Sequence, residues 1–378
     1  MERGERGGLY VHVPFCASKC PYCHFYSVPP SEAGLRTWRD GLATEAAAVA
    51  SAAAGEDIRF DTLYVGGGTP SLLGPDDVAR VRDLALARFP LEPAEFTLEA
   101  NPAEAARARL RGWREAGITR LSVGAQSFDD DVLRALGRAH TAGEGLRFCL
   151  EARQAGFEAL AVDLMTGIPG ETPGAIDRSL AAIREIAPDH VSLYLLENVE
   201  GLPFAEVLAR RPVDEDAAVD GFLRAAGALE AAGLRRYEIS NFARPGRECR
   251  HNLKYWRHEP FVGLGPSASS HLGGRRWTNK PTLASWAEAL ERSGSARDET
   301  VELDAAASAR EALVFGLRLV EGVDAEDIAL RTGVDVLARR GRKTAELVAE
   351  GLLVREGTRL RIPADKLLVS NAILSRLI

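Results

Sequence analysis

The sequence lacks any apolar run approaching the roughly 18 residues of a membrane-spanning helix. Its first six residues are mostly charged and do not contain the apolar core of a secretory signal peptide. We therefore expect a cytoplasmic protein that meets a membrane only through a partner.

Cysteine is scarce and the charge balance is acidic. Five cysteines without a secretion signal do not make a disulfide framework, so in a reducing compartment they serve metal chemistry or packing. Cys149, in an apolar helical setting, is expected to be a packed core thiol. The formal net charge of −7 disfavours general nucleic-acid binding. Basic residues at 339–343 raise a DNA-binding alternative, but a solvated helix face is the simpler interpretation in an acidic chain. We expect no nucleic-acid partner.

Short β-branched runs alternate with helical segments over the first 243 residues. Strands are predicted near residues 9–13, 62–65, 96–98, 121–123, 160–164, 191–196 and 237–239. Helices are predicted near residues 31–54, 75–88, 103–116, 130–136, 144–155, 173–186 and 215–232. Such repeats predict an α/β fold, a partial parallel (β/α) barrel with its working groups at the carboxyl ends of the strands. A doubly wound open sheet fits the same pattern.

The pattern changes after residue 243. Residues 244–302 are rich in Gly, Trp and His without a clear period, and we expect an irregular connecting segment there. Residues 303–378 predict a small domain that ends in a hairpin around Gly357. Its helices are predicted near residues 305–319, 325–332 and 336–350. The sequence thus predicts a barrel domain over 1–243, a connecting segment, and a helical, winged-helix-like C-terminal domain.

Three cysteines, Cys16, Cys20 and Cys23, fall within eight positions just beyond the first predicted strand. A zinc site must be weighed, because zinc takes four ligands and His24 follows the third cysteine. Adjacent residues rarely complete one tetrahedron, however. A four-iron cluster accounts for the spacing better, because three thiolates bind three irons and leave the fourth iron open for another ligand.

Glycine or polar residues lie at the ends of several predicted strands. Residues 66–68 are three consecutive glycines after the second strand, where glycine lets the backbone approach a ligand closely. Later strands carry polar groups at or near their ends: Glu99, Gln126 and Asp163. Because the carboxyl ends of parallel strands meet at one edge, we expect these groups to form one ligand site.

The Cys-x3-Cys-x2-Cys spacing resembles the signature of the radical S-adenosylmethionine (SAM) superfamily. The resemblance implies that Cys16, Cys20 and Cys23 hold a [4Fe-4S] cluster and that the amino and carboxylate groups of SAM bind its open iron. There, one electron from the cluster cleaves the sulfonium to give a 5′-deoxyadenosyl radical. It also implies an electron donor such as flavodoxin or ferredoxin if SAM is cleaved.

Nearly the whole chain is similar to the coproporphyrinogen III oxidase-like branch of that superfamily, which contains HemN-type oxidases and HemW-type haem chaperones. The similarity is carried by residues 9–16, 66–70, 124–128 and 163–170. It implies that Arg138 pairs with the SAM carboxylate. The residues implied to contact SAM are Tyr10, Tyr22, Gly66, Gly67, Gly68, Glu99, Gln126, Arg138 and Asp163.

Several features favour the chaperone over the oxidase. The oxidase has a further cysteine where this chain has Phe25, and it has an N-terminal extension, whereas fifteen residues precede Cys16 here. Residues 250–256 also look like the His-Asn-x-x-Tyr-Trp motif of HemW-type chaperones. One departure remains, because those chaperones usually have aspartate where this chain has His24. The resemblance implies a carrier that transfers haem to an acceptor protein, and the alternative is the oxidase or another radical SAM enzyme.

His251 is the leading haem-ligand candidate, because imidazole binds haem iron and the nearby Tyr255 and Trp256 offer rings for stacking. A histidine beside asparagine also fits a simple hydrogen-bonding role in a loop. Cys249 and His258 are the weaker candidates for the same ligand role. The implied partners are therefore haem and a haem-acceptor protein that the sequence does not identify.

Overall fold

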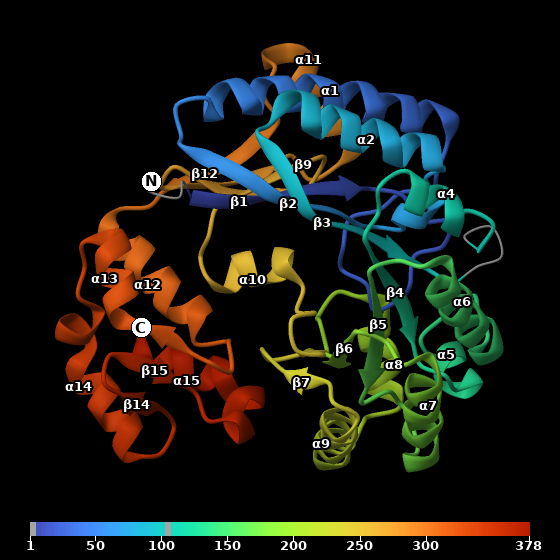
Figure 1. Cartoon of the computed structure of the whole chain (residues 1–378). Helices are drawn as coiled ribbons and strands as arrows, with labels where there is room; N and C mark the ends of the chain where they lie inside the picture. Colours follow the sequence, from blue (N-terminus) through green and yellow to red (C-terminus); the bar gives the residue numbers. More distant parts are fainter. Residues whose placement is uncertain (1–4, 103–106) are drawn as a thin grey trace.

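The computed structural model describes residues 5–102 and 107–378 (Figure 1). Within these residues, the larger sheet has the strand order β12-β11-β10-β9-β1-β2-β3-β4-β5-β6-β8-β7. Strands β1 to β6 pair in parallel with their neighbours in sequence. This order leaves β12 and β7 at the two edges, so the barrel is partial. The predicted α/β fold class is confirmed.

The barrel alternates strands with helices, as the sequence predicted for its first six units. The parallel strands are β1 (Glu5–Val13), β2 (Ile58–Gly67), β3 (Leu91–Ala100), β4 (Arg120–Gln126), β5 (Ala159–Thr166) and β6 (His190–Leu195). The intervening helices are α1 (Glu32–Ala53), η1 (Pro70–Leu72), α2 (Pro75–Arg88), α4 (Leu110–Glu115), α5 (Asp130–Ala135), α6 (Ala142–Ala155) and α7 (Pro173–Ile186). After β6 follow α8 (Pro203–Arg210), which was not predicted, and α9 (Glu215–Ala231). The helix predicted at 103–116 falls partly on 103–106, outside the described residues.

The alternation of β1 shows how the strands separate the core from the site. Leu9, Val11 and Val13 are almost fully buried and belong to the main apolar core. Tyr10 and His12 have the opposite parity, and successive side chains of a strand point to opposite faces. Polar rings of β1 are therefore directed to the barrel interior, away from the apolar contacts with the surrounding helices.

The seventh predicted strand, at residues 237–239, is wrong. These residues connect two short antiparallel strands, β7 (Arg235–Arg236) and β8 (Asn241–Ala243). The Tyr237 N–H donates to Asn241 O at 3.0 Å, which turns the chain back within a few residues. Strand β8 then pairs antiparallel with β6, so no seventh parallel unit forms here.

The segment 244–302 is also more regular than predicted. It contains α10 (Arg250–Trp256), β9 (Phe261–Leu264), β10 (Ser269–Leu272), β11 (Arg275–Asn279), α11 (Leu283–Ser293) and β12 (Arg297–Glu302). Strand β9 pairs in parallel with β1, so this segment extends the barrel sheet beyond its first strand. Its strands have only four to six residues, too few for a composition pattern to reveal.

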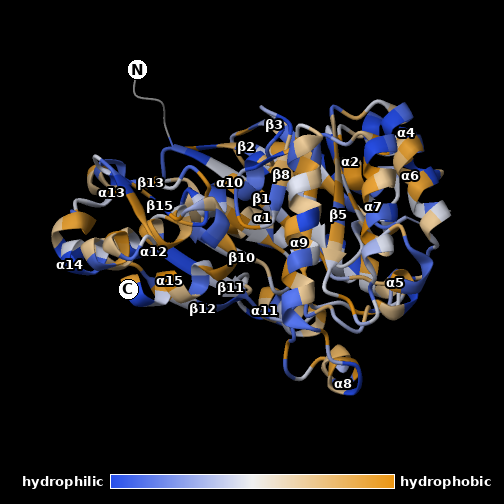
Figure 2. Cartoon of the chain, turned by 90° about the horizontal axis from the view of Figure 1, so that it is seen from below, coloured by the Kyte–Doolittle hydropathy of each residue, from blue (hydrophilic) through white to orange (hydrophobic). Residues whose placement is uncertain are grey.

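The C-terminal residues fold around a second apolar core, distinct from that of the barrel. This unit contains α12 (Ala305–Gly316), β13 (Val323–Asp324), α13 (Ala325–Thr332), α14 (Val336–Ala349), β14 (Val354–Glu356), β15 (Arg359–Arg361), η2 (Ala364–Val369) and α15 (Ser370–Leu377). Its small sheet has the order β13-β15-β14, and helices followed by a hairpin are the winged-helix-like pattern expected. It lies at the opposite end of the molecule from α5, α6 and α7 (Figures 1 and 2). None of the described helices is long and apolar enough to cross a membrane.

Candidate cluster and SAM site

The three cysteines of the motif lie on the loop between β1 and α1, at the carboxyl ends of the parallel strands. Backbone hydrogen bonds close the base of this loop: the Cys16 N–H donates to Val28 O at 3.0 Å, and the Val28 N–H donates to Pro14 O at 2.8 Å. Within the loop, the Cys23 N–H donates to Cys20 O at 3.1 Å. These bonds fix both ends of the loop and the turn between its last two cysteines.

The glycine run, of which Gly66 and Gly67 end β2 and Gly68 follows it, packs against the base of the same loop. The Gly68 N–H donates to Val13 O at 2.8 Å, and a Cβ atom at Gly68 would lie 2.6 Å from Phe15 O. Gly67 has a φ of 111°, and a Cβ atom there would lie 2.5 Å from the His12 ring. Both positions therefore require glycine, for space at the first and for space and backbone conformation at the second.

The three thiols are free and partly exposed, and two of them accept hydrogen bonds from side chains. Thr69 Oγ1 donates to Cys16 Sγ at 3.3 Å, and Arg138 Nη1 donates to Cys20 Sγ at 3.5 Å. Burial raises the pKa of the Cys23 thiol, and a hydrogen bond from the Phe25 backbone opposes that rise. Hydrogen-bond donors and a cation beside sulfur favour thiolates, the form that binds iron. The donor set therefore fits a cluster held by three thiolates.

Among the residues that the structure describes, no three His, Cys, Asp or Glu side chains converge as ligands of a single metal ion. Zinc would gather its sulfur ligands at about 2.3 Å from one centre, whereas a four-iron cluster spreads its ligands over several irons. Separated thiols on one loop are compatible with the second arrangement. Ligation of a cluster by Cys16, Cys20 and Cys23 stays a prediction.

Two residues that the sequence analysis did not single out link the cysteine loop to the strand ends. Asn101 Nδ2 donates to Thr69 Oγ1 at 3.2 Å, and Asn101 Oδ1 accepts from Arg138 Nη2 at 3.0 Å. Arg138 Nη2 also donates to Gly124 O at 2.7 Å. Thr69 lies within the 66–70 run and Asn101 comes two residues after Glu99, and these positions at strand ends were the available signal. To pair with a SAM carboxylate, Arg138 would use the guanidinium N–H groups that do not take part in these hydrogen bonds.

Glu99, at the end of β3, is held beside the glycine run. Its Oε1 accepts from Tyr64 Oη at 2.8 Å and its Oε2 accepts from the Gly67 N–H at 3.0 Å. A Cβ atom at Gly66 would lie 3.0 Å from Glu99 Oε1. Burial raises the pKa of Glu99 to about 7, with Asp163 adding to the rise and the two hydrogen bonds opposing it. A cationic ligand would favour the ionised form, so this carboxyl group suits an ammonium.

Asp163 and Gln126 are the predicted SAM-contacting residues on the two strands that follow β3, namely β5 and β4. Burial raises the pKa of Asp163 to about 6, although a hydrogen bond with Ser192 lowers it. Gln126 has a φ of 65°, a left-handed conformation that costs a non-glycine residue about 1 to 3 kcal/mol. Strain of this kind is concentrated at binding sites, which agrees with the predicted role of the β4 end.

The two tyrosines predicted to contact SAM lie in different parts of the site. Tyr10 Oη is hydrogen-bonded to His12 Nδ1 at 3.2 Å, and its ring stacks on Tyr64 at a centroid distance of 6.1 Å. Tyr22 packs edge-on against Phe204 at 6.3 Å. Tyr10 therefore joins the Glu99 group through Tyr64, whereas Tyr22 belongs to the cysteine loop.

A partial parallel barrel with three thiols after its first strand, glycines at the end of the second and carboxyl groups on the third and fifth defines a radical SAM protein. In agreement, the model of the Radical SAM superfamily matches residues 10–183, and that of the HemN C-terminal domain matches residues 303–365. Within this superfamily, the chain belongs to the HemW family.

The relatives match over most of their length. Heme chaperone HemW of Mycobacterium tuberculosis is 36% identical over 99% of this chain and 95% of its own. That of Bacillus subtilis is 30% identical over 86% of both chains. Radical S-adenosyl methionine domain-containing protein 1, mitochondrial, of Bos taurus is 33% identical over 99% of this chain and 88% of its own. The structure of coproporphyrinogen III oxidase (HemN) from Escherichia coli superimposes with a TM-score of 0.83 over 99% of this chain and 90% of its own. At 23% identity, this likeness establishes the fold alone.

The structure argues against His251 as a haem ligand in this conformation. Its Nδ1 is hydrogen-bonded to Thr62 Oγ1 and its Nε2 to Tyr255 Oη, both at 2.8 Å, and the residue is 1% exposed. Burial, reinforced by the charge of Lys254, lowers the pKa of His251 to about 3. Axial ligation needs a free ring nitrogen and access for a large planar molecule. His251 instead fastens α10 inside the barrel.

The weaker haem-ligand candidates are buried as well. Glu95 on β3 accepts from the Arg250 and His251 N–H groups, each at 3.2 Å, and Cys249 Sγ donates to its Oε1 at 3.6 Å. Burial raises the pKa of Cys249 to about 12. His258 is 7% exposed, and its Nε2 lies 3.4 Å from Glu311 Oε2. Neither residue presents an open group to a ligand.

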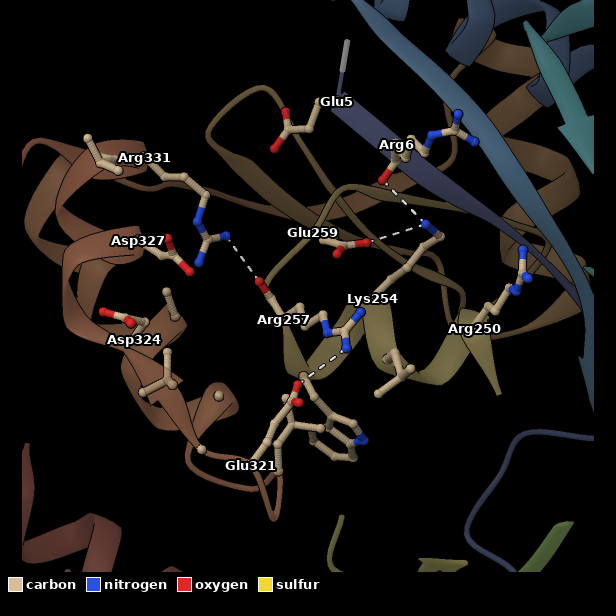
Figure 3. A pocket seen from close by; sticks show the side chains of 18 of the residues that line it. Glu5, Arg6, Arg250, Lys254, Arg257, Glu259, Glu321, Asp324, Asp327 and Arg331 are labelled. Atoms are coloured by element: carbon tan, nitrogen blue, oxygen red, sulfur yellow. Dashed lines mark hydrogen bonds and ion pairs between the residues drawn. The ribbon is translucent and has the colours of Figure 1, made fainter. Parts of the chain in front are cut away.

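The opposite face of α10 lines a cavity of about 810 Å³ between the barrel and the C-terminal unit (Figure 3). The lining has six basic and six acidic residues, and several of them pair. Arg257 Nη2 lies 3.3 Å from Glu321 Oε1, and Arg331 Nη1 donates to Arg257 O at 3.0 Å. Lys254 Nζ lies 2.7 Å from Asp61 Oδ1. None of the lining residues is a predicted cluster or SAM ligand.

Proposed function

We propose that the protein is a haem chaperone, which binds haem and passes it to an acceptor protein. The observation that carries this proposal is its place in the HemW family, whose members in Mycobacterium tuberculosis and Bacillus subtilis are named heme chaperones. The first of these matches over 99% of the chain. The match therefore includes the barrel, α10 and the C-terminal unit.

The cysteine loop is proposed to hold a [4Fe-4S] cluster through Cys16, Cys20 and Cys23, with one iron left for SAM. When bound, the cluster and SAM supply one-electron chemistry. Thr69 and Arg138 donate to two of the three sulfur atoms, which would stabilise their charge. Hydrogen bonds of this kind also orient the thiolates, so both residues are part of the proposed cluster site.

The residues proposed to contact SAM are Tyr10, Tyr22, Gly66, Gly67, Gly68, Glu99, Gln126, Arg138 and Asp163. Among them, Glu99 is placed to accept from an ammonium group through the remaining lone pairs of its carboxylate, while Tyr64 and the Gly67 N–H each donate to one of its oxygens. The glycine run leaves space for a ligand to approach the backbone. The charge of Arg138 would attract the SAM carboxylate while the guanidinium also bonds Cys20, joining SAM to the cluster loop.

The alternative function is oxygen-independent coproporphyrinogen III oxidation. An oxidase must abstract hydrogen from a porphyrinogen propionate and then dispose of an electron, so it needs more than a radical source. Phe25 stands where the oxidase has a further cysteine, and its side chain is 53% exposed. A phenyl ring offers neither a metal ligand nor a proton, which supports the carrier.

The function is tested by titrating haem into the anaerobically reconstituted protein and recording absorption spectra, with coproporphyrinogen III supplied in a parallel assay. We expect stoichiometric haem binding, and transfer of the bound haem to apomyoglobin as a generic acceptor. Protoporphyrinogen IX is not expected in the parallel assay. Sustained SAM-dependent decarboxylation without haem binding would overturn the carrier in favour of the oxidase.

The proposed carrier has protein partners and three parts. The natural haem acceptor is a protein of unknown identity, and an electron donor such as flavodoxin or ferredoxin would serve if SAM is cleaved. We place the domains at residues 1–243, 244–302 and 303–378. Because β9 pairs with β1, the middle segment is better described as an extension of the barrel than as a linker.

A further inference from the structure

We propose that His24 provides an imidazole ligand for haem iron, with the Phe25 ring lying against the porphyrin, at the outer rim of the cysteine loop. The inference rests on the proposed haem-carrier function and names the residue that holds the cargo. Both residues directly follow Cys23, the last cysteine of the motif. Haem would therefore lie at the cluster end of the barrel, away from α10.

The first support is a comparison of the seven histidines. The buried ones are His12, His140, His190, His251 and His258. His271 is partly buried, and its Nδ1 lies 3.4 Å from Glu259 O. His24 is exposed, and within the described chain it forms a ring contact but no hydrogen bond. An imidazole nitrogen is a common axial ligand of haem iron, and His24 offers one without any rearrangement of the fold.

The second support is the neighbouring aromatic ring. The His24 and Phe25 ring centroids are 4.5 Å apart at an interplanar angle of 34°. Phe25 is 53% exposed, although burial of a phenyl side chain is normally favourable. A porphyrin has two large apolar faces that would cover this ring. One ligand would thus explain both the open imidazole and the exposed phenyl group.

The third support is the segment after β6, which contacts the same loop. The Phe204 N–H donates to Pro21 O at 3.1 Å, which holds this segment against the cysteine loop. On β6 and this segment, Tyr194 and Val199 are large apolar residues with exposed fractions of 42% and 37%. Exposed apolar surface at one end of the barrel therefore comes from more than one element, as a flat apolar ligand requires.

An exposed ligand also fits the task of a carrier. A chaperone must release haem to its acceptor, so the iron should be reachable by a competing ligand from outside. His24 meets this requirement, whereas ligation by His251 would first break its hydrogen bonds to Thr62 and Tyr255. Because His24 adjoins Cys23, bound haem would also lie beside the proposed cluster.

The test uses the reconstituted protein and replaces His24→Asp, the residue that HemW-type sequences usually carry after the third cysteine. This variant should keep the cluster, which iron content checks, and His24→Asn serves as a second replacement. We expect the ferric haem spectrum to lose its imidazole-ligated form and haem affinity to fall at least tenfold. His271→Asn, which removes a different imidazole, should leave both unchanged.

Chemical rescue separates ligation from a structural effect. Free imidazole added to haem-loaded His24→Gly should restore the wild-type spectrum, and it should not alter the wild-type protein at the same concentration. An unchanged spectrum and affinity in His24→Asp and His24→Asn, or failure of the rescue, would overturn the assignment of His24 while the carrier function stands. If the wild-type protein binds no haem, the proposed function itself fails.

Discussion

Two histidine-bearing motifs lie in contrasting surroundings. The cysteine loop presents His24 at the carboxyl end of β1, exposed and without a hydrogen-bond partner among the described residues. The α10 motif presents His251 on the inner face of its helix, 1% exposed and bonded at both ring nitrogens. Motif similarity points to His251, but of these two histidines only His24 has ring nitrogens without a hydrogen-bond partner among the described residues.

The contrast shows that a sequence motif can be specific because its side chains hold the fold together. Helix α10 has two faces: His251 and Tyr255, four residues apart, contact the barrel interior, whereas Arg250 and Arg257 line the cavity toward the C-terminal unit. The Tyr64 and His251 ring centroids lie 5.1 Å apart in a tilted contact, and Tyr64 donates to Glu99, so the inner face also supports the SAM candidates. The HNxxYW-like motif is therefore explained by packing.

The largest expected effect concerns the thiols of the cysteine loop. Cys20→Ala should reduce the iron content of the reconstituted protein well below about four per chain, because a cluster ligand is lost. Cys149→Ala is the matched control: that thiol is buried in the apolar core, and burial raises its pKa to about 12. Its replacement should leave the iron content unchanged. Full iron content in Cys20→Ala, measured by colorimetric assay, would contradict the ligand assignment.

The contrast between the two histidines is tested directly by stability. His251→Ala removes a buried ring and leaves the Thr62 and Tyr255 hydroxyl groups without their partner, so the free energy of unfolding should fall by about 2 to 4 kcal/mol. His24→Ala should change it by less than about 0.5 kcal/mol, as for most exposed positions. Urea unfolding of both apo variants measures the difference. An equal loss of unfolding free energy in the two variants would contradict the contrast between the exposed His24 and the buried His251.

A smaller effect is expected for Glu99. This residue bonds Gly67 in the glycine run and, through Tyr64, is linked to His251 of the α10 motif. Its pKa is raised to about 7 by burial, so the carboxyl group is largely protonated at pH 6 before SAM binds. An ammonium ligand favours the carboxylate, and SAM affinity should therefore rise from pH 6 to 8 and level off above the pKa. Glu99→Gln should weaken SAM binding by about 1 to 3 kcal/mol at pH 8. It should also flatten the pH dependence.

Binding of SAM is measured by calorimetry over this pH range, with iron content checked at each pH. Asp163→Asn is the companion variant. Burial raises the pKa of Asp163 to about 6, so its contribution to SAM affinity should change at a lower pH than that of Glu99. The same raised pKa of Glu99 predicts that the apo protein loses stability as the pH rises from about 4.5 to 7, because the unfolded chain ionises first. A flat SAM profile in the wild-type protein would contradict the role of Glu99.

The parts of this arrangement that the sequence predicted are local. The cysteine spacing lies within eight residues, and the parallel strands are buried on both faces, which makes their apolar runs conspicuous. Helix α10 has only seven residues, and β9 to β12 are short, so neither left a periodic signal. The partner of His251 is Thr62, 189 residues away, and only the packing of α10 brings the two together. Exposure of His24 is likewise a property of the folded loop.

The smallest effect is expected on the outer face of α10, where the barrel meets the C-terminal unit. The ion pair between Arg257 and Glu321 joins side chains that are 47% and 58% exposed. Solvent screens such pairs, so a double-mutant cycle with Arg257→Ala and Glu321→Ala should give a coupling of about 0.2 to 1 kcal/mol that falls as salt rises. The hydrogen bond from Arg331 uses the backbone oxygen of Arg257, and the substitution leaves it in place. A coupling well above this range, insensitive to salt, would show that the outer face of α10 is as firmly held as its inner face, and the contrast between the two faces would then not hold.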